Sequence, residues 1–198
     1  MLLTLIRHGE VNGRTQVLRG RSDDALTEHG LQQMHDIFST IQSEVIAIAS
    51  SPLQRCRAFA ANLSKQRELP LHILDELREI NFGEWDNLTL SEAEAHDPRS
   101  FHAFKHDTER WQPPGGEPYT AFRDRVRTAL QQIINLNVSH VLAVTHGGVI
   151  RAMLAECLQL SAASAARIGV PPAGLCQLWL DENGSGSLLR LQWLEKPC

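Results

Sequence analysis

The chain has 198 residues, enough to bury one substantial core, and its length does not call for two domains. Its net charge of −4 excludes a broadly basic surface for nucleic acid or acidic membranes, so attraction of an anion must be local. The four cysteines form no C-x-x-C pair, which favours a reducing compartment over a disulfide framework or a zinc knuckle. No apolar run approaches the roughly 20 residues of a membrane-spanning helix. We therefore expect a cytoplasmic protein without a membrane or nucleic-acid partner.

The first third of the chain alternates strand and helix patterns. Residues 2–6 are almost wholly apolar, as in a strand that is covered on both faces. Thr27 predicts the N-cap of a helix, whose apolar stripe consists of Leu31, Met34, Ile37, Phe38 and Ile41. A second apolar strand is expected at residues 45–50. Ser51-Pro52 then predicts the start of a second helix, with Leu53, Ala60 and Leu63 facing inward.

The rest of the chain continues this alternation after an irregular stretch. Between about residues 86 and 118 the periodicity weakens, which predicts a partly helical insertion over the pocket. A third helix is indicated by the spacing of Phe122, Val126, Leu130 and Ile133. Residues 141–145 predict a third apolar strand, and Gly147-Gly148 begins a fourth helix with Ile150, Met153, Leu154 and Cys157 on its apolar side. Residues 176–180 and 188–194 flank a turn-rich linker typical of a hairpin.

These elements predict a single α/β domain over residues 1–198, a three-layer α/β/α sandwich with a mixed, mostly parallel sheet. Each of the three apolar strands is followed by His or Arg: Arg7 and His8, then Arg55, then His146. The carboxyl ends of parallel strands meet at one edge of a sheet. We therefore expect these side chains to form a pocket for an anion.

Hydrolysis of a phosphate monoester fits this set of side chains. An enzyme must neutralise the phosphoryl oxygens, supply a nucleophile and protonate the leaving alkoxide. Arg7 and Arg55 are planar forks suited to bidentate phosphate contacts, and the helix that Gly147 begins can add backbone donors. His8 and His146 would lie on either side of the phosphorus. One imidazole must be neutral to attack and the other can be cationic, and sequence order does not say which.

Motifs in a fixed order along nearly the whole chain resemble the histidine phosphatase (phosphoglycerate mutase-like) superfamily. They are Leu5-Ile6-Arg7-His8-Gly9-Glu10, Arg19-Gly20, Leu26-Thr27-x-x-Gly30-x-x-Gln33, Ser51-x-Leu53-x-Arg55, Leu77-x-Glu79-x-x-x-Gly83-x-Trp85 and Thr145-His146-Gly147-Gly148-Val149-Ile150-Arg151. A lone Arg-His-Gly is a weak signal, whereas the ordered set is specific.

The resemblance implies a role for each matching residue. His8 is the nucleophile that becomes phosphohistidine, while Arg7, Arg55 and His146 bind the phosphoryl oxygens. Glu79 is the acid that protonates the leaving oxygen and later deprotonates the attacking water, and apolar neighbours in sequence suit that role. No metal and no cofactor is expected, because guanidinium and imidazolium groups supply the positive charge.

The sequence departs from the family pattern at a few positions. Val11 and Arg14 stand where many members have Thr and a phosphate-contacting Asn, so either Asn12 replaces that amide or Arg14 meets the phosphate directly. Phe59 replaces a usual threonine, and Asn87 a common glycine. None of these changes removes a core catalytic group.

Other interpretations of individual residues stay open. A different carboxylate near Glu79, namely Asp75, Glu76 or Glu84, can serve as the acid. His102 and His106, with His96 close by, have the spacing of two zinc ligands, although a solvated face is favoured. Trp85 and Trp111 can stack on a substrate ring, but anchoring of the insertion is the favoured reading. Arg123, Arg125 and Arg127 are expected on the wet face of their helix.

Within the superfamily, two runs look most like the α-ribazole-5′-phosphate phosphatases of cobalamin nucleotide-loop assembly. They are residues 77–85 and the Pro114-Gly115-Gly116-Glu117 turn with Phe122, Arg125 and Val126. The expected partner is therefore a small phosphorylated metabolite, and a homodimer stays open. The alternatives are a phosphoglycerate mutase, a broad-specificity small-metabolite phosphatase and an inactive module that binds a phosphorylated ligand.

Overall fold

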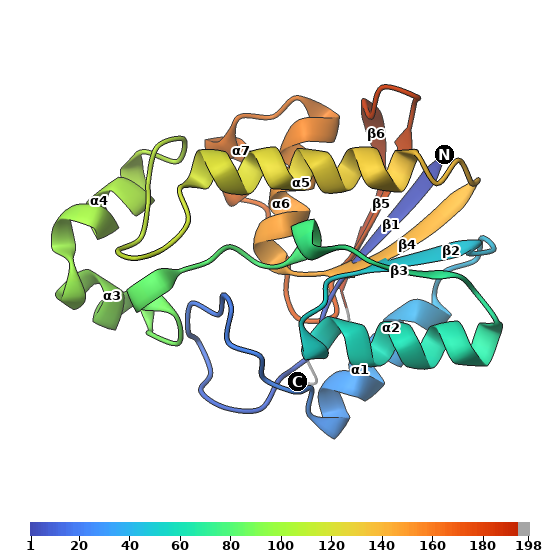
Figure 1. Cartoon of the computed structure of the whole chain (residues 1–198), viewed down its shortest axis with the longest axis horizontal. Coiled ribbons are helices and arrows are strands. Elements are labelled where there is room, and N and C mark those ends of the chain that lie inside the picture. Colours follow the sequence, from blue (N-terminus) through green and yellow to red (C-terminus); the bar gives the residue numbers. More distant parts are fainter. Residues whose placement is uncertain (194–198) are drawn as a thin grey trace.

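The computed structural model of the chain describes residues 1–193 and contains a six-stranded sheet flanked by helices (Figure 1). In chain order the elements are β1 (Leu2–Arg7), α1 (Glu28–Ser39), β2 (Ala47–Ser50), α2 (Gln54–Arg67), β3 (Leu71–Ile73), the 3₁₀ turns η1 (Asp75–Leu77) and η2 (Gly83–Trp85), α3 (Leu90–His96), α4 (Pro98–His106), α5 (Tyr119–Ile134), β4 (His140–Thr145), α6 (Gly147–Leu158), α7 (Ala162–Ala166), β5 (Leu175–Leu180) and β6 (Gly186–Gln192). None of these helices is long and apolar enough to cross a membrane.

The sheet is mixed and mostly parallel, as the sequence predicts. The strand order is β3-β2-β4-β1-β5-β6, in which β1 to β4 run parallel and β5 is antiparallel to both of its neighbours. In the register of the central pair, Arg7 lies opposite Thr145. The residues that follow, His8 and His146, therefore leave the sheet side by side.

Two layers of helices cover the sheet and confirm the sandwich. On one face, strand residues such as Ile48 and Leu142 pack with Met34 of α1 and Phe59 of α2. On the other face, alternate strand residues pack with α5 and α6, whose buried side chains include the predicted stripes, Phe122, Val126, Leu130 and Ile133 and then Ile150, Met153, Leu154 and Cys157. The central strands are thus covered on both sides.

Two details of the first two helices differ from the prediction. Thr27 caps α1 through Gly30 N as expected, but Leu31 of the predicted stripe is 36% exposed. Helix α2 begins at Gln54, with Leu53 as its N-cap, rather than at Ser51-Pro52. The Ser51 hydroxyl accepts from Leu53 N at 3.3 Å and lies 2.8 Å from a ring nitrogen of His146. The hairpin of β5 and β6 is confirmed through Gln192, and the predicted Leu194 lies outside the described residues.

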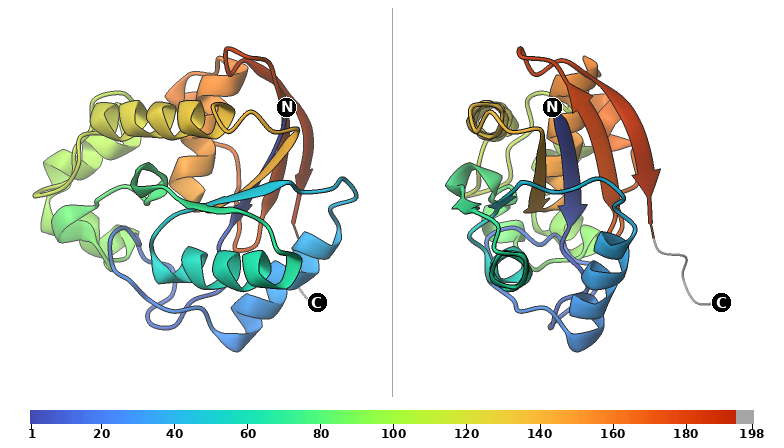
Figure 2. Two further views of the ribbon diagram at one scale, coloured as in Figure 1. Left: turned by 45° about the vertical axis from the view of Figure 1, so that its right-hand side comes forward. Right: turned by 90° about the vertical axis from the view of Figure 1, so that its right-hand side faces the viewer.

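The insertion carries α3 and α4, which lie together at one end of the molecule (Figure 2). It is tied to the loop between β1 and α1, since Asp86 accepts hydrogen bonds from the backbone N–H groups of Gly20, Arg21 and Ser22 at 2.8–2.9 Å. Trp85 is fully buried against Phe101 and Phe104. The insertion is therefore fastened to the loop that leaves β1.

Candidate active site

His8 lies at the carboxyl end of β1 and is 5% exposed. Its backbone N–H donates to Thr145 O at 3.0 Å, which ties it to the end of β4. The ring Nδ1 lies 2.8 Å from the carbonyl oxygen of Gly9. A carbonyl oxygen only accepts, so Nδ1 carries the proton and Nε2 keeps a free lone pair. This tautomer gives His8 a nucleophilic Nε2.

His146 follows β4 and is fully buried, with its ring centroid 5.3 Å from that of His8. Arg55 Nε donates to its Nδ1 at 3.3 Å, so the imidazole proton is on Nε2, which lies 2.8 Å from Ser51 Oγ. Burial, and then the charges of nearby arginines, lower the pKa of both His8 and His146 well below the usual value. Both imidazoles are therefore neutral at neutral pH. A cationic second histidine, which the sequence left open, is not indicated.

Two buried arginines supply the positive charge instead. Arg55 donates through Nη1 to Ser22 O at 2.5 Å and through Nη2 to Gly20 O at 2.8 Å. With Nε on His146, two of its five N–H groups remain for an anion. Arg7 donates through Nη1 to Val170 O, while its buried Nε has no partner among the described residues. Burial lowers the pKa of both guanidinium groups, but an arginine stays charged at neutral pH.

The N-terminus of α6 begins beside these groups. A Cβ on Gly147 would lie 3.6 Å from Arg7 Nε and 3.5 Å from Arg151 Nη1, so this glycine faces the guanidinium groups. The first N–H groups of a helix and its dipole favour negative charge. Arg7, Arg55 and the start of α6 thus surround the two imidazoles with groups that attract an anion.

Glu79 lies after η1 and contacts the first turn of α6. Its Oε2 accepts from Gly148 N at 2.9 Å and its Oε1 from Ile80 N at 3.1 Å, and the residue is 8% exposed. A Cβ on Gly148 would lie only 2.4 Å from Glu79 Oε1, so the carboxylate fills the space that this glycine leaves. By contrast, the side chains of Asp75 and Glu84 are 75% and 60% exposed. The buried carboxylate in this region is therefore Glu79.

The comparisons with known proteins agree with this geometry. Residues 3–193 match the family model described as histidine phosphatase superfamily (branch 1). The chain belongs to the histidine phosphatase superfamily. A curated relative, the adenosylcobalamin/alpha-ribazole phosphatase of Salmonella typhimurium, is 30% identical over 83% of each chain.

Other histidine phosphatases are similar at the same level. The metal-independent phosphoserine phosphatase of Arabidopsis thaliana is 33% identical over 81% of this chain and 70% of its own. The crystal structure of the alpha-ribazole phosphatase from Shigella flexneri superposes with a TM-score of 0.84, at 26% identity and 96% coverage of both chains. The chain thus has the phosphoglycerate mutase-like fold of the histidine phosphatases.

Two residues that the sequence predicted to bind substrate, Asn12 and Arg14, make hydrogen bonds to other parts of the chain. Asn12 Nδ2 donates to Leu26 O at 3.3 Å. Arg14 Nη2 donates to Glu92 at 2.8 Å, and its Nη1 donates to Asn87 O. The structure brings together His8, Arg7, Arg55, His146, Gly147 and Glu79, whereas the side chains of Asn12 and Arg14 hydrogen-bond to Leu26 and Glu92.

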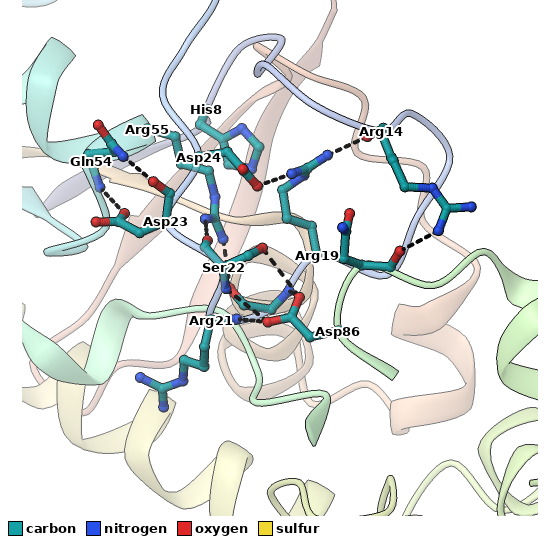
Figure 3. Close-up of polar contacts among 12 residues, drawn as sticks. His8, Arg14, Arg19, Arg21, Ser22, Asp23, Asp24, Gln54, Arg55 and Asp86 are labelled. Atoms are coloured by element: carbon teal, nitrogen blue, oxygen red, sulfur yellow. Dashed lines mark hydrogen bonds and ion pairs between the residues drawn. The ribbon is translucent and has the colours of Figure 1, made fainter. Parts of the chain in front are cut away.

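One arginine near the imidazoles was not assigned from the sequence. Figure 3 shows Arg19 and Asp24 beside His8, whereas the side chain of Arg21 points away. Arg19 pairs with Asp24, its side chain is 11% exposed, and its charge contributes to the lowered pKa of His8 after burial, Arg7 and Arg55. The Arg19-Gly20 motif was visible in the sequence, but no role followed from it.

The structure also shows where the tryptophans and histidines with open alternatives lie. Trp85 is fully buried and Trp111 is 6% exposed, stacking on Phe82 and Tyr119, so both anchor the insertion and stacking on a substrate ring is wrong. His102 and His106 lie on the exposed surface of α4. Within residues 1–193 no group of three or more His, Cys, Asp or Glu side chains is arranged to hold a metal ion.

Proposed function

We propose that the protein hydrolyses phosphate monoesters through a phosphohistidine on His8. The observation that carries the proposal is the tautomer of His8: Nδ1 is tied to Gly9 O, and Nε2 is free beside buried guanidinium groups. A neutral imidazole with a free Nε2 can attack phosphorus without first losing a proton. The arginines supply the charge that draws the phosphoryl group to it.

The reaction proceeds in two displacements. In the first, Nε2 of His8 forms a bond to phosphorus while the bond to the ester oxygen breaks, and the protonated Glu79 carboxyl gives its proton to that oxygen. In the second, Glu79 takes a proton from a water molecule, whose oxygen forms a bond to phosphorus while the bond between phosphorus and Nε2 of His8 breaks. Inorganic phosphate leaves, and His8 is again neutral.

Charge stabilisation comes from the chain itself. Negative charge spreads over three phosphoryl oxygens in the transition state. Arg7 Nε, the two remaining N–H groups of Arg55 and the backbone N–H of Gly147 are donors available to them. Each charge-assisted hydrogen bond contributes about 1.5–3 kcal/mol. No step of this mechanism requires a metal ion or a cofactor.

For the substrate we propose α-ribazole 5′-phosphate, in the assembly of the cobalamin nucleotide loop in the cytoplasm. The support is the likeness to the relative from Salmonella typhimurium, whose name gives this activity, over 83% of both chains. The Arabidopsis thaliana relative, named as a phosphoserine phosphatase, has a similar sequence identity of 33%. Phosphoserine is therefore the natural comparison substrate.

The test is a panel of kcat/KM values measured in EDTA with α-ribazole 5′-phosphate, phosphoserine, 3-phosphoglycerate and p-nitrophenyl phosphate. A preference of several powers of ten for the ribazole ester is expected. Similar low rates on every ester would keep the phosphatase and reject this substrate, while isomerisation of 3-phosphoglycerate would indicate a mutase. No turnover despite phosphate binding would indicate a binding module, and activity that EDTA abolishes would reject metal independence.

A further inference from the structure

Arg125 of α5 makes five hydrogen bonds around the segment that carries Glu79. Nη1 donates to the carbonyl oxygens of Glu76 at 2.8 Å and Arg78 at 2.6 Å, and Nη2 donates to that of Glu79 at 3.0 Å. Nε and Nη2 also donate to the carboxylate of Glu117 at 2.7 and 2.9 Å. The side chain of Arg125 is 17% exposed, so the expectation that it lies on the wet face of its helix is wrong.

Glu117, near the C-terminal end of the insertion, binds the same segment. Its Oε2 accepts from Asn81 N at 3.2 Å, and its own N–H donates to Asn81 O at 2.9 Å. Burial by itself would raise the pKa of Glu117, but the hydrogen bonds and charge of Arg125 outweigh burial and leave the pKa below its usual value. Glu117 is therefore the counter-charge that keeps Arg125 in place beside the carbonyl groups.

Thr145 holds the segment from the opposite side. Its Oγ1 donates to Leu77 O at 2.9 Å, and Thr145 directly precedes His146. The four successive carbonyl groups of residues 76–79 thus accept from side chains of α5 and β4. Among the described residues, none of these four carbonyls accepts from a backbone N–H of a helix or strand. Two side chains, Arg125 and Thr145, therefore bind all four carbonyl groups.

We infer that Arg125 is a positioning residue for Glu79, acting with Glu117 and Thr145. This inference rests on the proposed role of Glu79 as the general acid. The planar guanidinium reaches three carbonyl groups and one carboxylate at once, which the single ammonium of a lysine does not match. The bond to Glu79 O fixes the backbone from which the carboxyl group extends toward Gly148. Loosening that backbone moves the acid away from the leaving oxygen.

Arg123 offers a matched control. It is an arginine of the same helix, and its side chain is paired with Glu109 of the insertion and Glu156 of α6. It makes no hydrogen bond to residues 76–79. Replacing it by lysine disturbs ion pairs on α5 without touching the acid segment.

The experiment compares R125K and R123K with the full-length wild type in two measurements. Hydrogen exchange followed by mass spectrometry reports the mobility of peptides that contain residues 75–82. Kinetics report kcat/KM for p-nitrophenyl phosphate, whose leaving group needs little protonation, and for 2-glycerophosphate, whose alkoxide needs it. For R125K we expect faster exchange in these peptides and a loss of about 10- to 100-fold on 2-glycerophosphate, with a much smaller loss on p-nitrophenyl phosphate. R123K should resemble the wild type in both measurements.

The outcomes separate the positioning role from the proposed function. Unchanged exchange in R125K, or equal losses on both esters, would overturn the positioning role. Equal effects of R125K and R123K would also overturn it, because they would indicate a general loss of stability. A wild type that hydrolyses neither ester would reject the proposed function, and the exchange comparison would still decide whether Arg125 fixes the segment.

Discussion

The two halves of the candidate site are built differently. The phosphoryl-binding half, with His8 and His146, follows directly from two paired strands whose register places Arg7 opposite Thr145. The acid half, residues 76–82, belongs to no helix or strand apart from short turns and is held by Arg125, Thr145 and Glu117. The first half depends on backbone pairing, whereas the second depends on a few side chains from distant parts of the chain.

This difference predicts how each half responds to substitution. Backbone pairing in a sheet survives most changes of single side chains, so a substitution in the phosphoryl-binding half should remove chemistry without moving its neighbours. In the acid half, one side chain can shift the geometry of the whole segment. Leaving-group dependence distinguishes the two, because only the acid half donates a proton to the departing oxygen.

The largest expected effect is that of His8→Ala. It removes the nucleophile and should abolish both turnover and acid-labile phosphoenzyme, with a loss on the order of 10⁴-fold or more in kcat on every ester. Radiolabelled phosphate incorporation and initial rates measure both effects. His102→Ala, on the exposed face of α4, is the control and should retain both. Phosphoenzyme that survives in His8→Ala would contradict the assignment of the nucleophile.

Glu79→Gln should distinguish the contribution of the acid half from that of the phosphoryl-binding half. The amide keeps the size of the side chain but cannot supply the proton, so turnover of 2-glycerophosphate should fall by about 10² to 10⁴-fold, and that of p-nitrophenyl phosphate far less. Glu84→Gln is the control, since its side chain is 60% exposed. Equal losses of Glu79→Gln on both substrates would indicate that another group acts as the acid.

Gly148→Ala tests the contact between the halves. Its Cβ would lie 2.4 Å from Glu79 Oε1 and displace the carboxylate, for an expected loss of about 10- to 100-fold on alkyl phosphates. Because alanine favours a helix more than glycine, Tm should not fall through loss of helix propensity. Gly169→Ala, where nothing lies within 4 Å of the added Cβ, should leave the rates unchanged. Wild-type rates in Gly148→Ala would show that the acid tolerates displacement.

The smallest effect concerns pH and the buried imidazoles. In the folded protein burial and arginine charges hold the pKa values of His8 and His146 well below 6.5, whereas the unfolded chain titrates near 6.5. As pH falls below 6.5 the unfolded state binds protons that the folded state does not. The free energy of unfolding should therefore fall by up to about 1.4 kcal/mol per pH unit for each histidine.

Urea denaturation at pH 7, 6 and 5 measures this slope. His146→Gln should flatten it, while His102→Gln, at an exposed position, should leave it as in the wild type. An equal slope in all three proteins would show that the pKa of His146 is not lowered in the folded state.

Prediction from the sequence succeeded where local pattern and long-range structure coincide. Apolar runs that end in Arg7-His8 and Thr145-His146 predicted buried strands and a shared edge, and the structure confirms both. The sequence pattern gave a wrong prediction where an arginine on a helix can face either solvent or buried carbonyl groups. Arg123, Arg125 and Arg127 have equivalent spacing in sequence, but only Arg125 turns toward the carbonyl groups of residues 76–79.

The sequence by itself determined five of the six described strands, the long amphipathic helices and the order of the charged residues that follow the strands, because hydrophobic periodicity and turn residues act over short distances. It did not indicate the short elements β3 and α7. The tertiary structure decided the tautomer of His8, the neutral state of His146, the pairing of Arg14 with Glu92 and the attachment of Glu79 to α5 and β4. Each of these depends on burial and on partners far away in the chain, which local sequence does not specify.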